Sequence, residues 1–183
     1  TLNIFNPYSL AYLRGLGVDR FTLSPELNFN QVRSFPDREK CEIIVHGELV
    51  LLVSRYCMLG GILGKEAGRC GGHCRQDHYF IRDEKGYTFP VETDADCRFY
   101  LFNSRTLCMV DELDKVIKLG AGFIRIEARR SDSKQVGEWV ALYRQALDQL
   151  AAGQKIDPGK YRDELLRCSS SPFSKYHYYR GVI

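Results

Sequence analysis

Long hydrophobic runs are missing from this sequence of 183 residues. The longest run, Leu49 to Val53, has the length of a β-strand, whereas a membrane-spanning helix needs roughly 20 apolar residues. The net charge of +3 is small, so charge alone gives no reason to expect nucleic acid as a partner. No signal peptide is visible. With 44% hydrophobic and 27% charged residues, the composition is typical of a soluble domain with its own core.

Several familiar catalytic motifs are also absent. The sequence contains neither H-E-x-x-H nor G-x-S-x-G, the motifs of zinc peptidases and of α/β-hydrolases. It has no paired C-x2-C knuckles of the zinc-ribbon type. The radical-SAM pattern C-x3-C-x2-C fails because Asp77 stands where the third cysteine belongs. A Cys–His dyad stays open, since such partners meet in space and not in sequence.

The chain is rich in cysteine, which can bind metals. Seven is an odd number, which argues against a secreted disulfide framework and favours a reducing cytoplasm. Four cysteines follow the pattern C-x12-C-x3-C-x22-C, with glycines crowding the first two gaps: Cys57, Cys70, Cys74 and Cys97. Four thiolates can hold a [4Fe–4S] cluster or a zinc ion. The spacing by itself leaves both metals open.

The segments outside this cysteine-rich region alternate between strands and amphipathic helices, as in a parallel α/β sheet. Four strands are predicted, at 2–5, 20–23, 41–45 and 123–127. The spacing resembles that of a TIM-type barrel, of which residues 1–46 and 111–153 would form half. Residues 47–110 are predicted to be an insertion that contains a β-hairpin, and residues 154–183 a C-terminal helix and aromatic tail. Half a barrel has open edges, so we expect a second chain or an N-terminal half to complete it.

Several segments together resemble one family. The stretches VHGELVLLVSRYC, CGGHCR, DEKGYTFPV, DADCRFYLFNS and LGAGFIRIEAR, with the opening NIFNPYSLAYLRGLGVDRFTLSPEL, are similar to the U32 peptidase family, the collagenase-like proteases. The resemblance covers almost the whole chain and corresponds to the C-terminal half of the family's barrel region. It implies either proteolysis or oxygen-independent hydroxylation of quinone precursors or RNA bases, with prephenate as oxygen donor.

The same resemblance implies a [4Fe–4S] cluster on four cysteines. Cys57, Cys70 and Cys74 match the spacing of one hydroxylase subunit of the family, and Cys97 is the candidate for the fourth ligand. Some members place a cluster cysteine where this chain has Val50, which bears on the identity of the ligands and not on their number. A structural zinc ion in a non-catalytic subunit is the alternative reading of the same four thiols.

Six polar residues are candidates for the substrate side of the site. His46 ends the third predicted strand and Arg55 precedes the first cysteine, so they are predicted to donate a proton and to hold an anion. Glu127 is predicted to be catalytic because it follows a strand within the family motif. Three further residues are candidates for substrate binding: Glu26, Asn103 and Arg129. Each has a structural alternative, such as a satisfied core histidine or an ion pair between Glu127 and Arg129.

Overall fold

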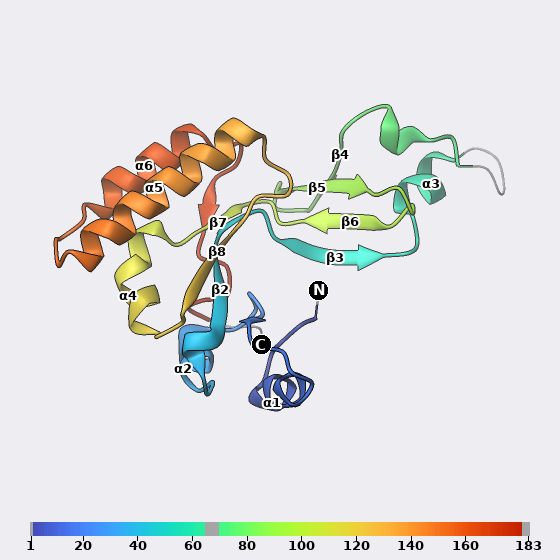
Figure 1. The fold of residues 1–183 in the computed structure, drawn as a ribbon. Coiled ribbons are helices and arrows are strands. Elements are labelled where there is room, and N and C mark those ends of the chain that lie inside the picture. Colours follow the sequence, from blue (N-terminus) through green and yellow to red (C-terminus); the bar gives the residue numbers. More distant parts are fainter. Residues whose placement is uncertain (1, 65–69, 181–183) are drawn as a thin grey trace. The chain divides into compact units, whose positions relative to one another are not determined.

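The structure is a computed structural model that describes residues 2–64 and 70–180. These residues form two compact units, which are described separately (Figure 1). The first unit is built from Thr1–Gly47 and Thr106–Ile183, and the second from Glu48–Arg105. All four clustered cysteines therefore belong to the second unit.

A mixed sheet forms the centre of the first unit. Its parallel strands are β1 (Phe21–Thr22), β2 (Cys41–Gly47) and β8 (Phe123–Glu127), with β2 in the middle. Ile4 adds a single parallel bridge to Leu23 on the far side of β1. Two short strands extend this sheet. Strand β7 (Thr106–Cys108) pairs antiparallel with the last residues of β2, and β9 (Phe173–Ser174) pairs parallel with β7.

The predicted α/β class is confirmed, but the described residues form no closed barrel. The half-barrel remains a prediction, in keeping with parallel neighbours that follow one another in chain order. Sequence patterns did not predict β7 and β9. The second compact unit spans Glu48–Arg105, and the insertion at residues 47–110 stays a prediction.

Side-chain caps explain where most helices of the first unit begin. Asn6 accepts a hydrogen bond from the Ser9 amide at 2.9 Å, and Asp132 accepts one from the Gln135 amide at 2.8 Å, which satisfies amides that lack a partner within the helix. The helices are α1 (Pro7–Gly15), α2 (Phe29–Arg33), α4 (Leu113–Lys118), α5 (Ser133–Ala151) and α6 (Pro158–Arg167), with 3₁₀ turns at Arg38–Lys40 and Val110–Glu112.

Helix α5 supplies the largest core side chains of the first unit, Trp139 and Tyr143. The Tyr143 hydroxyl donates to the Val45 carbonyl at 3.0 Å and accepts from the Met109 amide at 3.3 Å. One buried hydroxyl thus ties α5 to β2 and to the segment that follows β7. Helix α6 packs beside α5 (Figure 1).

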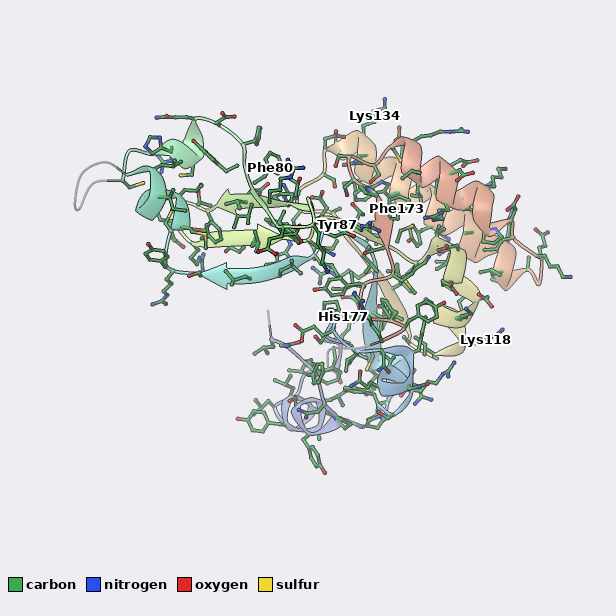
Figure 2. All side chains as sticks on the ribbon, turned by 180° about the vertical axis from the view of Figure 1, so that it is seen from behind. Phe80, Tyr87, Lys118, Lys134, Phe173 and His177 are labelled. Atoms are coloured by element: carbon green, nitrogen blue, oxygen red, sulfur yellow. The ribbon has the colours of Figure 1, made fainter. Side chains whose placement is uncertain are left out.

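The aromatic C-terminal tail packs against the first unit. The Tyr178 hydroxyl is buried and donates to the Ile44 carbonyl at 2.6 Å, and the Tyr178 carbonyl accepts from the Phe29 amide at 2.9 Å. Lys115 Nζ donates to the Tyr179 hydroxyl at 3.0 Å. His177, between Tyr176 and Tyr178 in the same tail, is labelled in Figure 2. These contacts give the aromatic residues of the tail a structural role.

The second unit is a four-stranded antiparallel sheet in the order β3-β6-β5-β4. Its strands are β3 (Val50–Ser54), β4 (Tyr79–Arg82), β5 (Thr88–Thr93) and β6 (Phe99–Phe102), with α3 (Met58–Leu63) and a 3₁₀ turn (His73–Arg75) between β3 and β4. Among the described helices, none combines the length and the hydrophobicity that a membrane span requires.

The core of this second unit is small. Its buried hydrophobic residues, among those described, are Leu49, Val91, Phe99 and Phe102. Other apolar side chains are exposed, including those of residues 51–53 on the edge strand β3 and that of Phe80 on β4 (Figure 2). A unit of this size with so little buried apolar surface is typical of domains that rely on a metal or another staple.

Candidate functional site

Cys57 and Cys70 converge on one small space in the second unit. Cys57 follows β3 and caps α3, where its Sγ accepts a hydrogen bond from the Gly60 amide at 3.4 Å. A Cβ atom on Gly60 would lie 3.7 Å from Cys57 Sγ and 3.8 Å from Cys70 Sγ. The two sulfur atoms therefore flank the same glycine, whose missing side chain leaves room between them.

Strand register places the other two cysteines at the same end of the sheet. Ser54 pairs with Phe99, so the end of β3, which leads to Cys57, lies beside the start of β6, which follows Cys97. Tyr79 pairs with Val91, so the chain that enters β4 from Cys74 arrives at this end as well. Figure 1 shows α3 beyond this end of the strands.

The four thiols suit a metal cluster in their chemistry, and two of them are already adjacent. All seven cysteines are free thiols. Within residues 2–64 and 70–180, no three His, Cys, Asp or Glu side chains are grouped closely enough to hold a metal ion. At least two of the four thiols would therefore have to approach the others when a cluster binds. One of these sulfur atoms, Cys57 Sγ, already accepts a hydrogen bond from the Gly60 amide.

His46 lies in the first unit, fully buried at the end of β2. Its ring makes edge-to-face contacts with the rings of Trp139, Tyr143 and Phe173, whose centroids lie 4.4, 5.4 and 5.7 Å away. Its Nδ1 lies 3.3 Å from the Tyr143 hydroxyl. Burial lowers the pKa of His46 to about 3, because the charged imidazolium loses its hydration. The ring is therefore neutral at physiological pH, and its predicted role as a proton donor would require it to become accessible.

Glu127 is nearly buried and has a guanidinium on each of its oxygens. Arg129 Nε donates to Oε1 at 2.5 Å, and Arg125 Nη2 donates to Oε2 at 3.2 Å. Arg125 also reaches Glu42 Oε1 at 3.4 Å, and the Thr22 hydroxyl donates to that same oxygen at 2.7 Å. The Glu127 carboxylate is thus fixed between two guanidinium groups, and the more exposed Arg129 is suited to bind an anion.

A glycine lets this charged group sit against β2. Gly47 pairs with Glu127 and has a φ of +121°. A Cβ atom at Gly47 would lie 1.9 Å from the Glu127 carbonyl oxygen, so no larger residue fits without moving the backbone of β8. The position of Glu127 thus depends on the residue that follows His46.

The remaining predicted residues are divided between the two units. Glu26 is half-buried in the first unit. The pKa of the Tyr176 hydroxyl is raised, mainly by burial and to a lesser extent by the charge of Glu26. In the second unit Arg55 is exposed. The backbone amide of Asn103 donates to the Leu49 carbonyl at 2.9 Å. The structure brings Glu127 and Arg129 together. That all six residues share one site stays a prediction.

Sequence reasoning missed three residues that complete these arrangements: Thr22, Glu42 and Asp94. The first two join the charged group across neighbouring parallel strands, which no local pattern reveals. Asp94 could have been found, because it begins a hairpin loop as Asp83 does in the predicted hairpin. Its side chain makes four hydrogen bonds around Cys97.

Curated proteins resemble this chain at low identity. An uncharacterized protease from Methanocaldococcus jannaschii is 26% identical over 174 residues, which covers 89% of this chain and 42% of that protein. The tRNA hydroxylation protein P1 of Bacillus subtilis is 22% identical, over 92% of this chain and 41% of that protein. The tRNA hydroxylation protein P of Escherichia coli is 24% identical, over 85% of this chain and 44% of that protein.

The chain therefore spans about two fifths of the length of these curated relatives. No solved structure matches it significantly. A family model described as peptidase family U32 matches residues 1–182. This match confirms the resemblance seen in the cysteine segment and in the strand motifs, and the chain belongs to peptidase family U32.

Proposed function

We propose that this chain carries the [4Fe–4S] site of an oxygen-independent hydroxylase that acts on an RNA base or another aromatic ring. The observation that supports this most directly is the convergence of Cys57 Sγ and Cys70 Sγ beside Gly60, with an amide already donating to sulfur. Amide bonds of this kind tune iron–sulfur clusters. Relatives named tRNA hydroxylation proteins support the choice of reaction and of tRNA as the substrate class to test first.

The proposed ligands are Cys57, Cys70, Cys74 and Cys97. A bound cluster would supply one-electron chemistry at the end of the second sheet. The small core of the second unit agrees with a bound metal, since metal binding adds folding free energy to domains of this kind. A zinc ion would meet the same structural need, so a zinc-containing, non-catalytic subunit that completes a partner's barrel is the alternative for this site.

On the substrate side, the chain's own groups would bind and orient. Arg55 and Arg129 can each hold a carboxylate or phosphate in bidentate fashion, and prephenate, the proposed oxygen donor, carries carboxylates. Glu127 would keep Arg125 and Arg129 in place, and the neutral ring of His46 would support the end of β2 by packing against it. The predicted substrate contacts of Glu26 in the first unit and of Asn103 in the second unit are separate proposals.

Metal content is the first test of this proposal. The native protein, purified without oxygen, is assayed for iron, acid-labile sulfide and zinc. We expect about four irons and four sulfides per chain, and loss of most iron when Cys57, Cys70, Cys74 or Cys97 is replaced by serine. Cys168→Ser is the matched control, because Cys168 lies in the first unit and its thiol donates to the Leu165 carbonyl at 3.2 Å. One zinc ion and no iron would refute the hydroxylase proposal and support the zinc-containing subunit.

Substrate is tested in cells. Mass spectrometry of tRNA nucleosides from a deletion strain should show that a hydroxylated nucleoside is lost, and the wild-type gene should restore it while Cys57→Ser does not. Unchanged tRNA would redirect the search to quinone precursors.

Peptidase activity is the second candidate, because the family and the archaeal relative carry that name. Its test is cleavage of denatured collagen by the metal-free protein. Cleavage that survives metal removal and is abolished by Cys70→Ser or His73→Ala would favour a Cys–His peptidase over the hydroxylase.

A further inference from the structure

Two hairpin loops of the second unit have the same backbone design. One, Asp83–Tyr87, joins β4 to β5, and the other, Asp94–Arg98, joins β5 to β6. In each, the aspartate amide donates to the carbonyl of the fifth residue, at 3.0 and 3.1 Å, and the amide of the fourth residue donates to the aspartate carbonyl at 3.0 Å. In each, the aspartate side chain also accepts the amide of the fifth residue, at 2.8 and 2.9 Å.

The loops differ at their fourth residue. Both loops need a left-handed backbone there, with φ of +82° for Gly86 and +59° for Cys97. Glycine adopts this conformation without steric cost, but a side chain such as that of cysteine does not. Strained residues of this kind persist only where the surroundings hold them, and they cluster at functional sites.

The loop that carries Cys97 has additional support. Asp94 Oδ1 also accepts the Asp96 amide at 3.0 Å, and Oδ2 accepts Arg98 Nε at 2.7 Å and the Tyr100 hydroxyl at 2.9 Å. Arg98 Nη2 donates to Asp96 Oδ2 at 2.9 Å. In the Asp83–Tyr87 loop, which carries Gly86, the Asp83 side chain makes the hydrogen bond to the Tyr87 amide named above. The extra bonds thus accompany the strained cysteine.

The two loops also lie at opposite ends of the sheet, because successive hairpins of an antiparallel sheet turn at opposite ends. The Asp94–Arg98 loop lies at the end where Cys57 leaves β3 and where the chain from Cys74 enters β4. The strained position is therefore occupied by a thiol at the end that holds the other clustered cysteines, and by glycine at the end that lacks them.

We propose that Asp94 is a positioning residue for Cys97: through Arg98 and Tyr100 it holds the loop so that the Cys97 thiolate is presented as the fourth ligand of the cluster. This inference rests on the proposed function. It adds the residue that holds Cys97, a proposed ligand, in a left-handed backbone conformation that cysteine rarely adopts. Asp94 itself does not touch the metal.

The test uses Asp94→Ala, with Asp83→Ala as the matched control from the glycine loop. Each protein is reconstituted with iron and sulfide, and iron release to an excess of chelator is followed together with the electron paramagnetic resonance spectrum of the reduced cluster. We expect Asp94→Ala to release iron at least about tenfold faster than wild type, as removal of an outer-shell partner does at other metal sites, and to alter the spectrum. Asp83→Ala should stay within about twofold of wild type, with an unchanged spectrum.

A second variant guards against a folding defect. Asp94→Asn keeps an oxygen for the Asp96 and Arg98 amides but loses the charge that pairs with Arg98, and it should release iron at an intermediate rate. The inference is overturned if the wild-type protein holds four irons while both Asp94 variants behave like Asp83→Ala. If the wild-type protein holds no iron, the proposed function has failed as well, and the two failures are told apart by that measurement.

Discussion

The two units of this chain are stabilised in different ways. The first has a core of large aromatic and aliphatic side chains beneath its sheet, with Trp139 and Tyr143 fully buried. The second buries few apolar residues, exposes three in a row on β3, and holds the clustered cysteines. The first unit can therefore rely on hydrophobic burial, whereas the second needs an additional source of stability, for which the proposed metal is suited.

Removing the metal should have the largest effect and should be confined to the second unit. We expect amide hydrogen exchange in β3 and β6 to become much faster when the metal-loaded protein is stripped with chelator, because the four buried apolar residues hold the sheet only weakly. Amides in β2 and α5 should keep their protection. Equal loss in both units would show that the units do not differ in this way.

In the first unit, Trp139→Ala should lower the free energy of unfolding by about 3–5 kcal/mol, as for other buried aromatic residues. Val140→Ala, at the next position and half exposed, should cost less than about 1 kcal/mol. Denaturant melts followed by circular dichroism measure both. A small loss for Trp139→Ala would contradict the view that hydrophobic burial dominates this unit.

The first unit should also lose stability in acid through His46. Its pKa is about 3 in the folded protein, against an ordinary value of 6.5, so the unfolded chain binds this proton more tightly. The contribution is complete above pH 6.5 and is lost as the pH falls toward 3, by about 2 kcal/mol between pH 7 and pH 5.

His46→Phe fits the aromatic surroundings and should remove this slope. Unfolding free energies of both proteins at several pH values provide the measurement. If the two proteins depend on pH in the same way, His46 is not the group responsible.

The smallest effect concerns the two hairpin loops. Cys97→Gly should stabilise the metal-free protein by about 1 kcal/mol, because glycine accepts the left-handed backbone without strain, and it should weaken cluster retention. Gly86→Ala should destabilise the protein by a similar amount without affecting iron. Thermal melts of the metal-free proteins test this, and a loss of stability with Cys97→Gly would show that Cys97 is not strained.

Local patterns predicted much of the chain well. The strand Phe123–Glu127 was expected with the bounds that the structure has, because the residues that determine it are neighbours in sequence. The caps Asn28 and Asp132 are local features of the same kind. The strands Thr106–Cys108 and Phe173–Ser174 were missed. They are too short to show a periodicity, and they exist only because distant segments complete their hydrogen bonds.

The sequence by itself determined the family, the set of four cysteines and the presence of a hairpin in the cysteine-rich segment, since each depends on residue type and short spacing. Only the tertiary structure decided that Cys57 and Cys70 meet at Gly60, that His46 is enclosed by aromatic rings, and that Glu127 is held by two arginines. These features arise from strand register and helix packing between segments far apart in the chain, and the free energy of such contacts is not encoded in any local pattern.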